Sequence, residues 1–248
     1  MRIDVVFGPG GITPPLVGGR TVAVIDVLRA STTIAAALHH GARNVVPVES
    51  ADEVSTRAKQ LDRAEVLLAG ERRMLKIDGF DLGNSLLEYT RDVVDGKTVM
   101  LTTTNGTAAF AGLSGAREVL VACYANFTVV ARVLRQASKH GADITLLCAG
   151  RDRMFSLEDA ACAGRFVKAL LRRATPAVLG DGAMAGLLVD RRYGENLARL
   201  FGDAEHGRAL ADAGFGDDLK ACANVDAYPV VPAFQDRQIT ALATARGR

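Results

Sequence analysis

The residues best suited to chemistry in this 248-residue chain are acidic and hydroxyl side chains that follow short apolar runs. The first set is Asp26 with Arg29, after which Ser31, Thr32 and Thr33 open an alanine-rich stretch. A carboxylate at a strand tip suits a divalent cation, and the N–H groups of a starting helix attract an anion. Helix N-caps and surface ion pairs use the same residue types, so this set alone does not define a site.

A second polar stretch, residues 70–85, places Glu71, Lys76, Asp81 and Asn84 among three glycines. Glycine lets the backbone approach a ligand closely, and carboxylate and amide oxygens are the donors that magnesium prefers. Lys76 would neutralise phosphate charge. The alternative is a solvated loop, because glycine and aspartate also favour turns.

A third set stands between an apolar run, residues 98–102, and an alanine-containing stretch that reads as a helix. Its hydroxyl, amide and backbone groups could contact the oxygens of an anion. Asn105-Gly106 also resembles a hairpin turn, but the helical pattern that follows favours a turn from strand to helix. The set comprises Thr103, Thr104, Asn105, Gly106 and Thr107.

A pair of adjacent carboxylates, Glu158 and Asp159, follows the apolar run 144–148. The pair is a candidate for metal binding or for acid–base chemistry. Ser156 with Asp159 also has the spacing of a reciprocal helix cap, and acids in a first turn complement the helix dipole.

Alternating β-branched and Ala/Leu-rich segments predict the elements that position these residues. Such alternation is typical of a three-layer α/β/α fold with a mostly parallel or mixed sheet, with room for two similar lobes. In such sheets ligands lie beyond the carboxyl ends of the strands. The expected strands are 3–7, 21–25, 44–48, 66–69, 98–102, 118–122 and 144–148. The expected helices are 32–40, 51–61, 107–113, 127–140, 157–172 and 184–190, with more helix in 195–221.

Composition narrows the class of protein. A hydrophobic content of 49% supports a single α/β domain over residues 1–248, with residues 180–216 as a peripheral helical segment, and it allows a homodimer. A net charge of +2 and the absence of tryptophan argue against a nucleic-acid partner. No apolar run is long enough for a membrane span, and four scattered cysteines fit a cytoplasmic protein. We expect the four histidines to be surface or capping residues.

The ordered set of turns resembles the 2-phosphosulfolactate phosphatase family over roughly residues 24–164. The chain departs from the family pattern at Leu86, where proline is usual, and at Arg151-Asp152-Arg153, where smaller residues and a glycine are usual. The motifs that carry the resemblance are DVLRASTT from Asp26, GER from Gly70, KIDGFDLGNS from Lys76, TTNGT from Thr103, and CAG from Cys148 followed by FSLED from Phe155.

The resemblance implies a magnesium-dependent phosphatase that hydrolyses 2-phospho-3-sulfolactate to 3-sulfolactate and phosphate, a step of coenzyme M biosynthesis. Asp26, Glu71 and Glu158 are then the expected metal carboxylates. Asp81 or Asp159 is the expected general acid or base. Arg29 and Lys76 would bind phosphate, with the remaining polar residues of the turns holding the substrate.

Three alternatives remain open at this point. The protein could act on another small phosphorylated carboxylic acid, it could bind an anionic metabolite without catalysis, or it could have a structural or interaction role. The clustering of acids at strand ends favours an enzyme over the last two.

Overall fold

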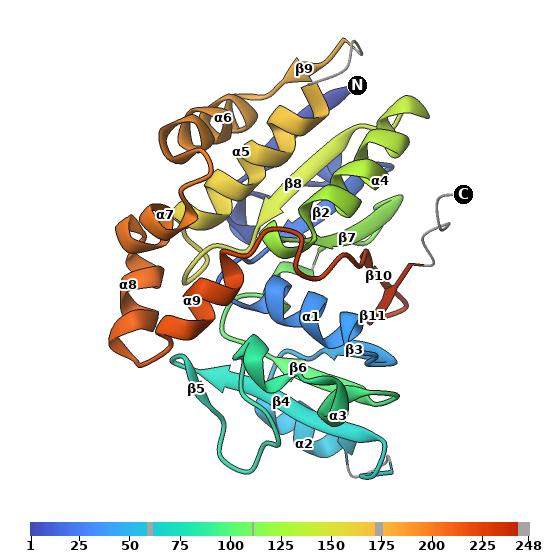
Figure 1. The fold of residues 1–248 in the computed structure, drawn as a ribbon. Coiled ribbons are helices and arrows are strands. Elements are labelled where there is room, and N and C mark those ends of the chain that lie inside the picture. Colours follow the sequence, from blue (N-terminus) through green and yellow to red (C-terminus); the bar gives the residue numbers. More distant parts are fainter. Residues whose placement is uncertain (59–61, 111, 172–175, 243–248) are drawn as a thin grey trace, which may run out of the picture.

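The computed structural model describes residues 1–58, 62–110, 112–171 and 176–242. Within these residues eleven strands form one sheet in the order β5-β4-β6-β3-β11-β10-β7-β2-β8-β1-β9 (Figure 1). The strands are β1 Arg2–Val6, β2 Thr21–Ile25, β3 Asn44–Pro47, β4 Val66–Arg72, β5 Leu75–Lys76, β6 Thr98–Thr102, β7 Glu118–Ala122, β8 Ile144–Cys148, β9 Val178–Leu179, β10 Pro232–Gln235 and β11 Gln238–Ala241.

The sheet consists of two parallel groups of strands. One group is β4, β6 and β3, and the other is β7, β2, β8, β1 and β9. The hairpin of β10 and β11 lies between the groups and pairs antiparallel with one strand of each. Ala233 of β10 pairs with Leu120, and Ile239 of β11 pairs with Val45. The described strands thus form one continuous mixed sheet.

The central strand β2 shows why the middle of the sheet forms where it does. All five residues of Thr21–Ile25 are buried. Ala23 and Ile25 pack into one apolar cluster, whereas Val22 and Val24 pack into another. Because successive side chains of a strand point to opposite faces, a continuous apolar run is stable only where both faces are covered.

Helices cover the sheet and connect its strands. In Figure 1, α4 and α5 lie across the group that contains β7, β2 and β8, and α2 lies behind β4. The three-layer α/β fold expected from the sequence is therefore confirmed. The helices of this part are α1 Ala30–His39, α2 Ala51–Ala58, α3 Arg91–Val94, α4 Phe127–Lys139 and α5 Leu157–Leu171.

The segment after α5 is a run of helices along one side of the molecule: α6 Asp181–Tyr193, α7 Leu197–Asp203, α8 Glu205–Asp212 and α9 Gly216–Cys222. In Figure 1, α8 and α9 lie beside the ends of the strands rather than beyond an outer edge of the sheet. This segment is therefore placed to contribute to a site at the strand ends.

The expected strands are present within a residue or two of their predicted bounds, apart from β4, which continues to Arg72. The helix expected over 107–113 is instead a short 3-10 turn, Thr107–Phe110, and residue 111 lies outside the described residues. Residues 59–61 and 172, at the ends of two other expected helices, also lie outside them. No helix in the described part of the chain is long and apolar enough to cross a membrane.

Candidate active site

A polar pocket of about 280 Å³ lies where the ends of strands from both parallel groups meet. The turns after β2, β6 and β8 supply Asp26, Thr103 and Arg151, and the end of β4 supplies Glu71. Because these turns leave different strands, a single pocket gathers residues that are more than a hundred positions apart in the sequence. The other lining residues are Leu28, Arg29, Arg73, Met74, Asn84, Thr104, Asn105, Asp152 and His206.

Asp26 lies directly at the end of β2 and is 7% exposed. Its Oδ1 accepts a hydrogen bond from the Ala30 N–H at 3.2 Å, and its own N–H donates to the Ser31 hydroxyl at 2.9 Å. Burial raises the pKa of Asp26 to about 6, opposed by His206 and reinforced by Glu158 and Glu71. A carboxylate held in this way binds a cation favourably, because the cation replaces the solvation that burial removes.

Glu71 reaches the pocket from the end of β4, beside the hairpin to β5, and is 6% exposed. Its two carboxylate oxygens accept hydrogen bonds from the N–H groups of Thr104 at 2.7 Å and Met74 at 2.8 Å. Glu71 thereby fixes the turn after β6 and the β4–β5 hairpin relative to each other.

Asn84 contributes a buried amide oxygen that has no hydrogen-bond partner among the described residues. The residue is 5% exposed, and its backbone carbonyl accepts a hydrogen bond from the Thr33 hydroxyl at 2.9 Å. A buried oxygen without a donor costs free energy unless a ligand satisfies it. Asn84 therefore marks the pocket as a place where a cation or a donor group fits.

Arg29 is buried beside the pocket and is held on several sides. Its guanidinium donates to Asp218 at 2.6 Å and to the Met74 carbonyl at 2.9 Å, and it lies 4.2 Å from the ring centroid of Phe215. Asp218 in turn accepts a hydrogen bond from the Ser85 hydroxyl at 2.6 Å. A guanidinium has five N–H donors, so donors remain for an anion in the pocket.

The turn after β6 lines the pocket with Thr103, Thr104 and Asn105. Gly106 is required there, because a Cβ at this position would come within 2.8 Å of the Asp26 Oδ2 atom. The side chain of Thr107 lies outside the described residues. The turn predicted from the sequence thus lies against the carboxylate predicted to bind metal.

Ser31 and Thr32 serve the local structure of α1 and do not line the pocket. The Ser31 hydroxyl accepts from the Asp26 N–H, and the Thr32 hydroxyl donates to the Val27 carbonyl at 2.9 Å. Both side chains shape the β2–α1 turn that holds Asp26.

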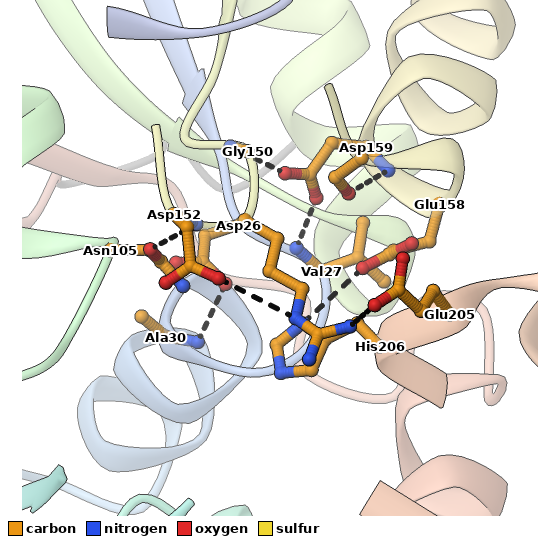
Figure 2. A network of polar contacts seen from close by, with 12 residues as sticks. Asp26, Val27, Ala30, Asn105, Gly150, Asp152, Glu158, Asp159, Glu205 and His206 are labelled. Atoms are coloured by element: carbon orange, nitrogen blue, oxygen red, sulfur yellow. Dashed lines mark hydrogen bonds and ion pairs between the residues drawn. The ribbon is translucent and has the colours of Figure 1, made fainter. Parts of the chain in front are cut away.

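Glu158, in the first turn of α5, pairs with His206 at the start of α8 (Figure 2). Its Oε1 is 3.5 Å from the His206 Nδ1 atom, and the two side chains are 3% and 16% exposed. His206 lines the pocket, whereas Glu158 does not. The carboxylate expected to bind metal therefore has a histidine as its partner.

Asp159 has a structural position next to Glu158 (Figure 2). Its carboxylate accepts hydrogen bonds from the N–H groups of Val27 at 2.8 Å and Gly150 at 3.1 Å. Burial, with the charges of Glu158 and Asp26, raises the pKa of Asp159 well above its ordinary value. Asp159 therefore ties the start of α5 to the turns after β2 and β8, and it does not line the pocket.

The structure does not bring Asp81 and Lys76 to the pocket. After the β4–β5 hairpin the chain runs back along β4, so the Asp81 carboxylate accepts from the Leu68 N–H at 2.8 Å, partway along that strand. The same carboxylate pairs with Arg63 at 3.1 Å. Lys76 is exposed on β5.

The loop after β8 closes one side of the pocket with a tight turn at Asp152 and Arg153, whose φ angles are 50° and 64°. Arg151 and Met154 exchange backbone hydrogen bonds across this turn. The Arg151 guanidinium pairs with Glu205 at 2.8 Å, and the Asp152 N–H donates to the Asn105 side chain at 2.9 Å (Figure 2). The departure from the family pattern therefore lies at the pocket itself.

Sequence reasoning missed His206 and Asp218 as residues of this site. Both follow the long helix α5 in the chain, in or just beyond the segment that was expected to be peripheral, and each reaches the site by long-range packing. No local sequence pattern points to either residue. A histidine in the polar first turn of a helix, for example, is ordinary in any surface helix.

The oxygen donors fit a magnesium ion. Among the described residues no three His, Cys, Asp or Glu side chains already form a closed metal cluster. Magnesium, however, usually keeps several waters and takes one or two carboxylates together with phosphate oxygens. Asp26 and Glu71 supply two carboxylates in the pocket, and the unpartnered amide oxygen of Asn84 supplies a third oxygen donor.

The fold and the pocket at its strand ends place the protein among α/β proteins with a polar ligand site. Residues 13–237 match the 2-phosphosulpholactate phosphatase family. The chain therefore belongs to this family and is a phosphatase, a hydrolase of phosphoric monoesters. The family expected from the sequence motifs is confirmed.

Three relatives illustrate the match, and each is named a probable 2-phosphosulfolactate phosphatase. The protein of Caldanaerobacter subterraneus subsp. tengcongensis is 39% identical over 213 residues, which is 86% of this chain and 87% of the relative. That of Symbiobacterium thermophilum is 38% identical, over 90% of this chain and 95% of its own. That of Clostridium perfringens strain SM101 is 36% identical, over 96% of both chains.

Proposed function

We propose that the protein is a magnesium-dependent phosphatase that hydrolyses 2-phospho-3-sulfolactate to 3-sulfolactate and phosphate. The observation that carries the proposal is the meeting of Asp26, Glu71, Asn84 and Arg29 in one pocket at the strand ends. The names of the relatives support the substrate. A role in coenzyme M biosynthesis, a cytoplasmic location and a homodimer stay predictions.

The acids Asp26, Glu71 and Asp152 balance the three arginines that line the pocket, so a bound cation would make the pocket suit this substrate better. The substrate carries phosphate, carboxylate and sulfonate groups, whereas Asp26 and Glu71 are themselves acidic. Asp26, Glu71 and the Asn84 amide oxygen would hold a magnesium ion, which when bound neutralises phosphate oxygens. Arg29, fixed by Asp218, would donate to the phosphate and orient it for attack by water.

The first experiment is phosphate release from 2-phospho-3-sulfolactate by purified protein, with magnesium and after its removal by a chelator. We expect activity only with magnesium. Asp26→Asn keeps the size of the side chain but removes the charge that holds the cation, so we expect kcat/KM to fall by about a hundredfold or more.

Two matched variants accompany Asp26→Asn. Asp92→Asn makes the same chemical change at an exposed position of α3 and should keep wild-type activity. Asp81→Asn tests the acid–base role expected from the sequence, and we expect it to retain most activity because Asp81 lies outside the pocket. If Asp81→Asn lowered kcat/KM as much as Asp26→Asn does, Asp81 would have to be part of the active site.

A substrate panel separates the remaining alternatives. Release of phosphate from 2-phospholactate or another phosphorylated carboxylic acid, but not from 2-phospho-3-sulfolactate, would replace the named substrate. Binding of these anions by calorimetry without any phosphate release would instead identify a non-catalytic binding protein.

A further inference from the structure

We propose that His206 is the general acid that protonates the leaving alcohol oxygen, and that Glu158 is the positioning residue for His206. The inference rests on the proposed phosphatase function and adds a proton donor to it. His206 lines the same pocket as Asp26 and Glu71, although it comes from α8, far along the chain.

The pair with Glu158 engages one nitrogen of the His206 ring. The Nδ1 atom lies 3.5 Å from the Glu158 carboxylate. The Nε2 atom is on the opposite edge of the ring, and the described residues give it no hydrogen-bond partner. A histidine held through one nitrogen presents the other as a proton donor or acceptor. Figure 2 marks the contact between His206 and Glu158 with a dashed line.

The burial of Glu158 is the second observation. The residue is 2% exposed, and its carboxylate pairs with His206. A buried carboxylate is costly unless a partner group accompanies it, so the contact with Glu158 holds the His206 ring in place. The adjacent Asp159 binds the backbone N–H groups of Val27 and Gly150, which holds this end of α5 against the turn that carries Asp26.

A proton donor would assist the reaction. Water attacks phosphorus, the bond from phosphorus to the ester oxygen breaks, and an alkoxide would leave. Alkoxides are poor leaving groups, and guanidinium groups do not release protons at neutral pH. The proton on Nε2 passes to the ester oxygen as the bond breaks and gives the alcohol. Both protons of the attacking water are then on the phosphate, and one returns to Nε2 to restore the imidazolium.

The experiment compares two substrates that differ in how well the alcohol leaves: 2-phospholactate and 2-phospho-3,3,3-trifluorolactate. The fluorines stabilise the alkoxide, so the second substrate needs less protonation. With His206 in place, the wild-type protein should hydrolyse both at similar rates. We expect His206→Gln to lower kcat for 2-phospholactate by about 10²- to 10⁴-fold and kcat for the trifluoro compound far less.

Glu158→Gln tests the positioning role. It should lower kcat for 2-phospholactate less than His206→Gln does, and it should cost nothing further when His206→Gln is already present. His140→Gln makes the same change at an exposed histidine after α4 and should leave both rates unchanged. Circular dichroism and thermal melting establish that each variant is folded.

Equal losses on both substrates in His206→Gln would overturn the inference and leave the phosphatase function intact. If His206→Gln does not fold, the wild-type comparison decides, because a much faster rate on the trifluoro compound would show that no acid assists the leaving group. A wild-type protein without activity on any phosphoester would overturn the proposed function itself.

Discussion

At the scale of single residues, the pocket contains arginines that are held in different ways. Arg29 is buried and bound to Asp218, whereas Arg151 stands at the rim and pairs with the exposed Glu205. A buried guanidinium that is neutralised by a carboxylate suits the phosphate, which is the group common to all substrates of a phosphatase. The Arg151 guanidinium, whose partner Glu205 is exposed, can exchange that partner for a second acidic group of the substrate.

We therefore expect Arg151→Gln to weaken binding of substrates that carry an extra acidic group. KM for 2-phospho-3-sulfolactate should rise about tenfold or more, the cost of losing a hydrogen bond to a charged group, while KM for an uncharged alkyl phosphate changes little. Arg153→Asn is the matched control, because Arg153 does not line the pocket and asparagine tolerates its positive φ. Equal effects of Arg151→Gln on both substrates would contradict a role in recognition.

The sequence predicted the part of the site that follows directly from strand ends. Asp26, Glu71 and Thr103 each stand within a residue or two of a buried strand, so their common location follows from the sheet. Asp81 is different, because the β4–β5 hairpin turns the chain back along β4 before Asp81 is reached. His206 depends on the packing of α8, which no local pattern encodes.

At the scale of elements, α5 and α6 approach closely because glycines face each other. A Cβ on Gly164 of α5 would collide with the backbone carbonyl of Gly186 in α6. The same helix α5 carries Glu158 and Asp159 in its first turn, so its packing positions part of the site.

We expect Gly164→Ala to lower the free energy of unfolding by about 2 kcal/mol or more, since backbone cannot yield as a side chain can. Gly202→Ala is the control, because Gly202 lies in α7 and an alanine Cβ there would have no described atom within 4 Å apart from its chain neighbours and the backbone of its own helix. Alanine at this position should stabilise the helix by roughly 0.5–1 kcal/mol. Chemical denaturation of both variants measures the difference. Equal stability of the two would refute close packing between α5 and α6.

Buried strands of five mostly apolar residues, such as β2 and β8, were predicted from their composition. The short strands β5, β9, β10 and β11 were not, because two to four residues carry too little pattern to distinguish a strand from a loop. Without β10 and β11, the sequence could not predict that the two parallel groups form one sheet, because these two strands connect them.

At the scale of the whole molecule, ionic contacts tie the first strand to the rest of its group. Asp4 of β1 accepts hydrogen bonds from Arg2 at 2.9 Å and from Arg20, just before β2, at 2.7 Å. Burial alone would raise the pKa of Asp4, but these arginines outweigh it and lower the pKa below its ordinary value.

A carboxylate with a lowered pKa stabilises the fold above its unfolded-state pKa, and this contribution is lost as pH falls through the folded-state value. We therefore expect Asp4→Asn to reduce stability by about 1–2 kcal/mol near neutral pH, with the difference from wild type shrinking below about pH 4. Urea denaturation across this pH range measures it, with Asp92→Asn as the control. A difference that is independent of pH would show that the charge of Asp4 is not responsible.

The hairpin of β10 and β11 also sets the order in which the protein can be completed during synthesis. Residues 232–241 leave the ribosome after the rest of the sheet, yet they fill the gap between β3 and β7 in its middle. The two parallel groups can each form earlier, but their edges stay unpaired until this segment emerges. A nascent chain therefore carries both halves of the pocket before it carries the strands that join them.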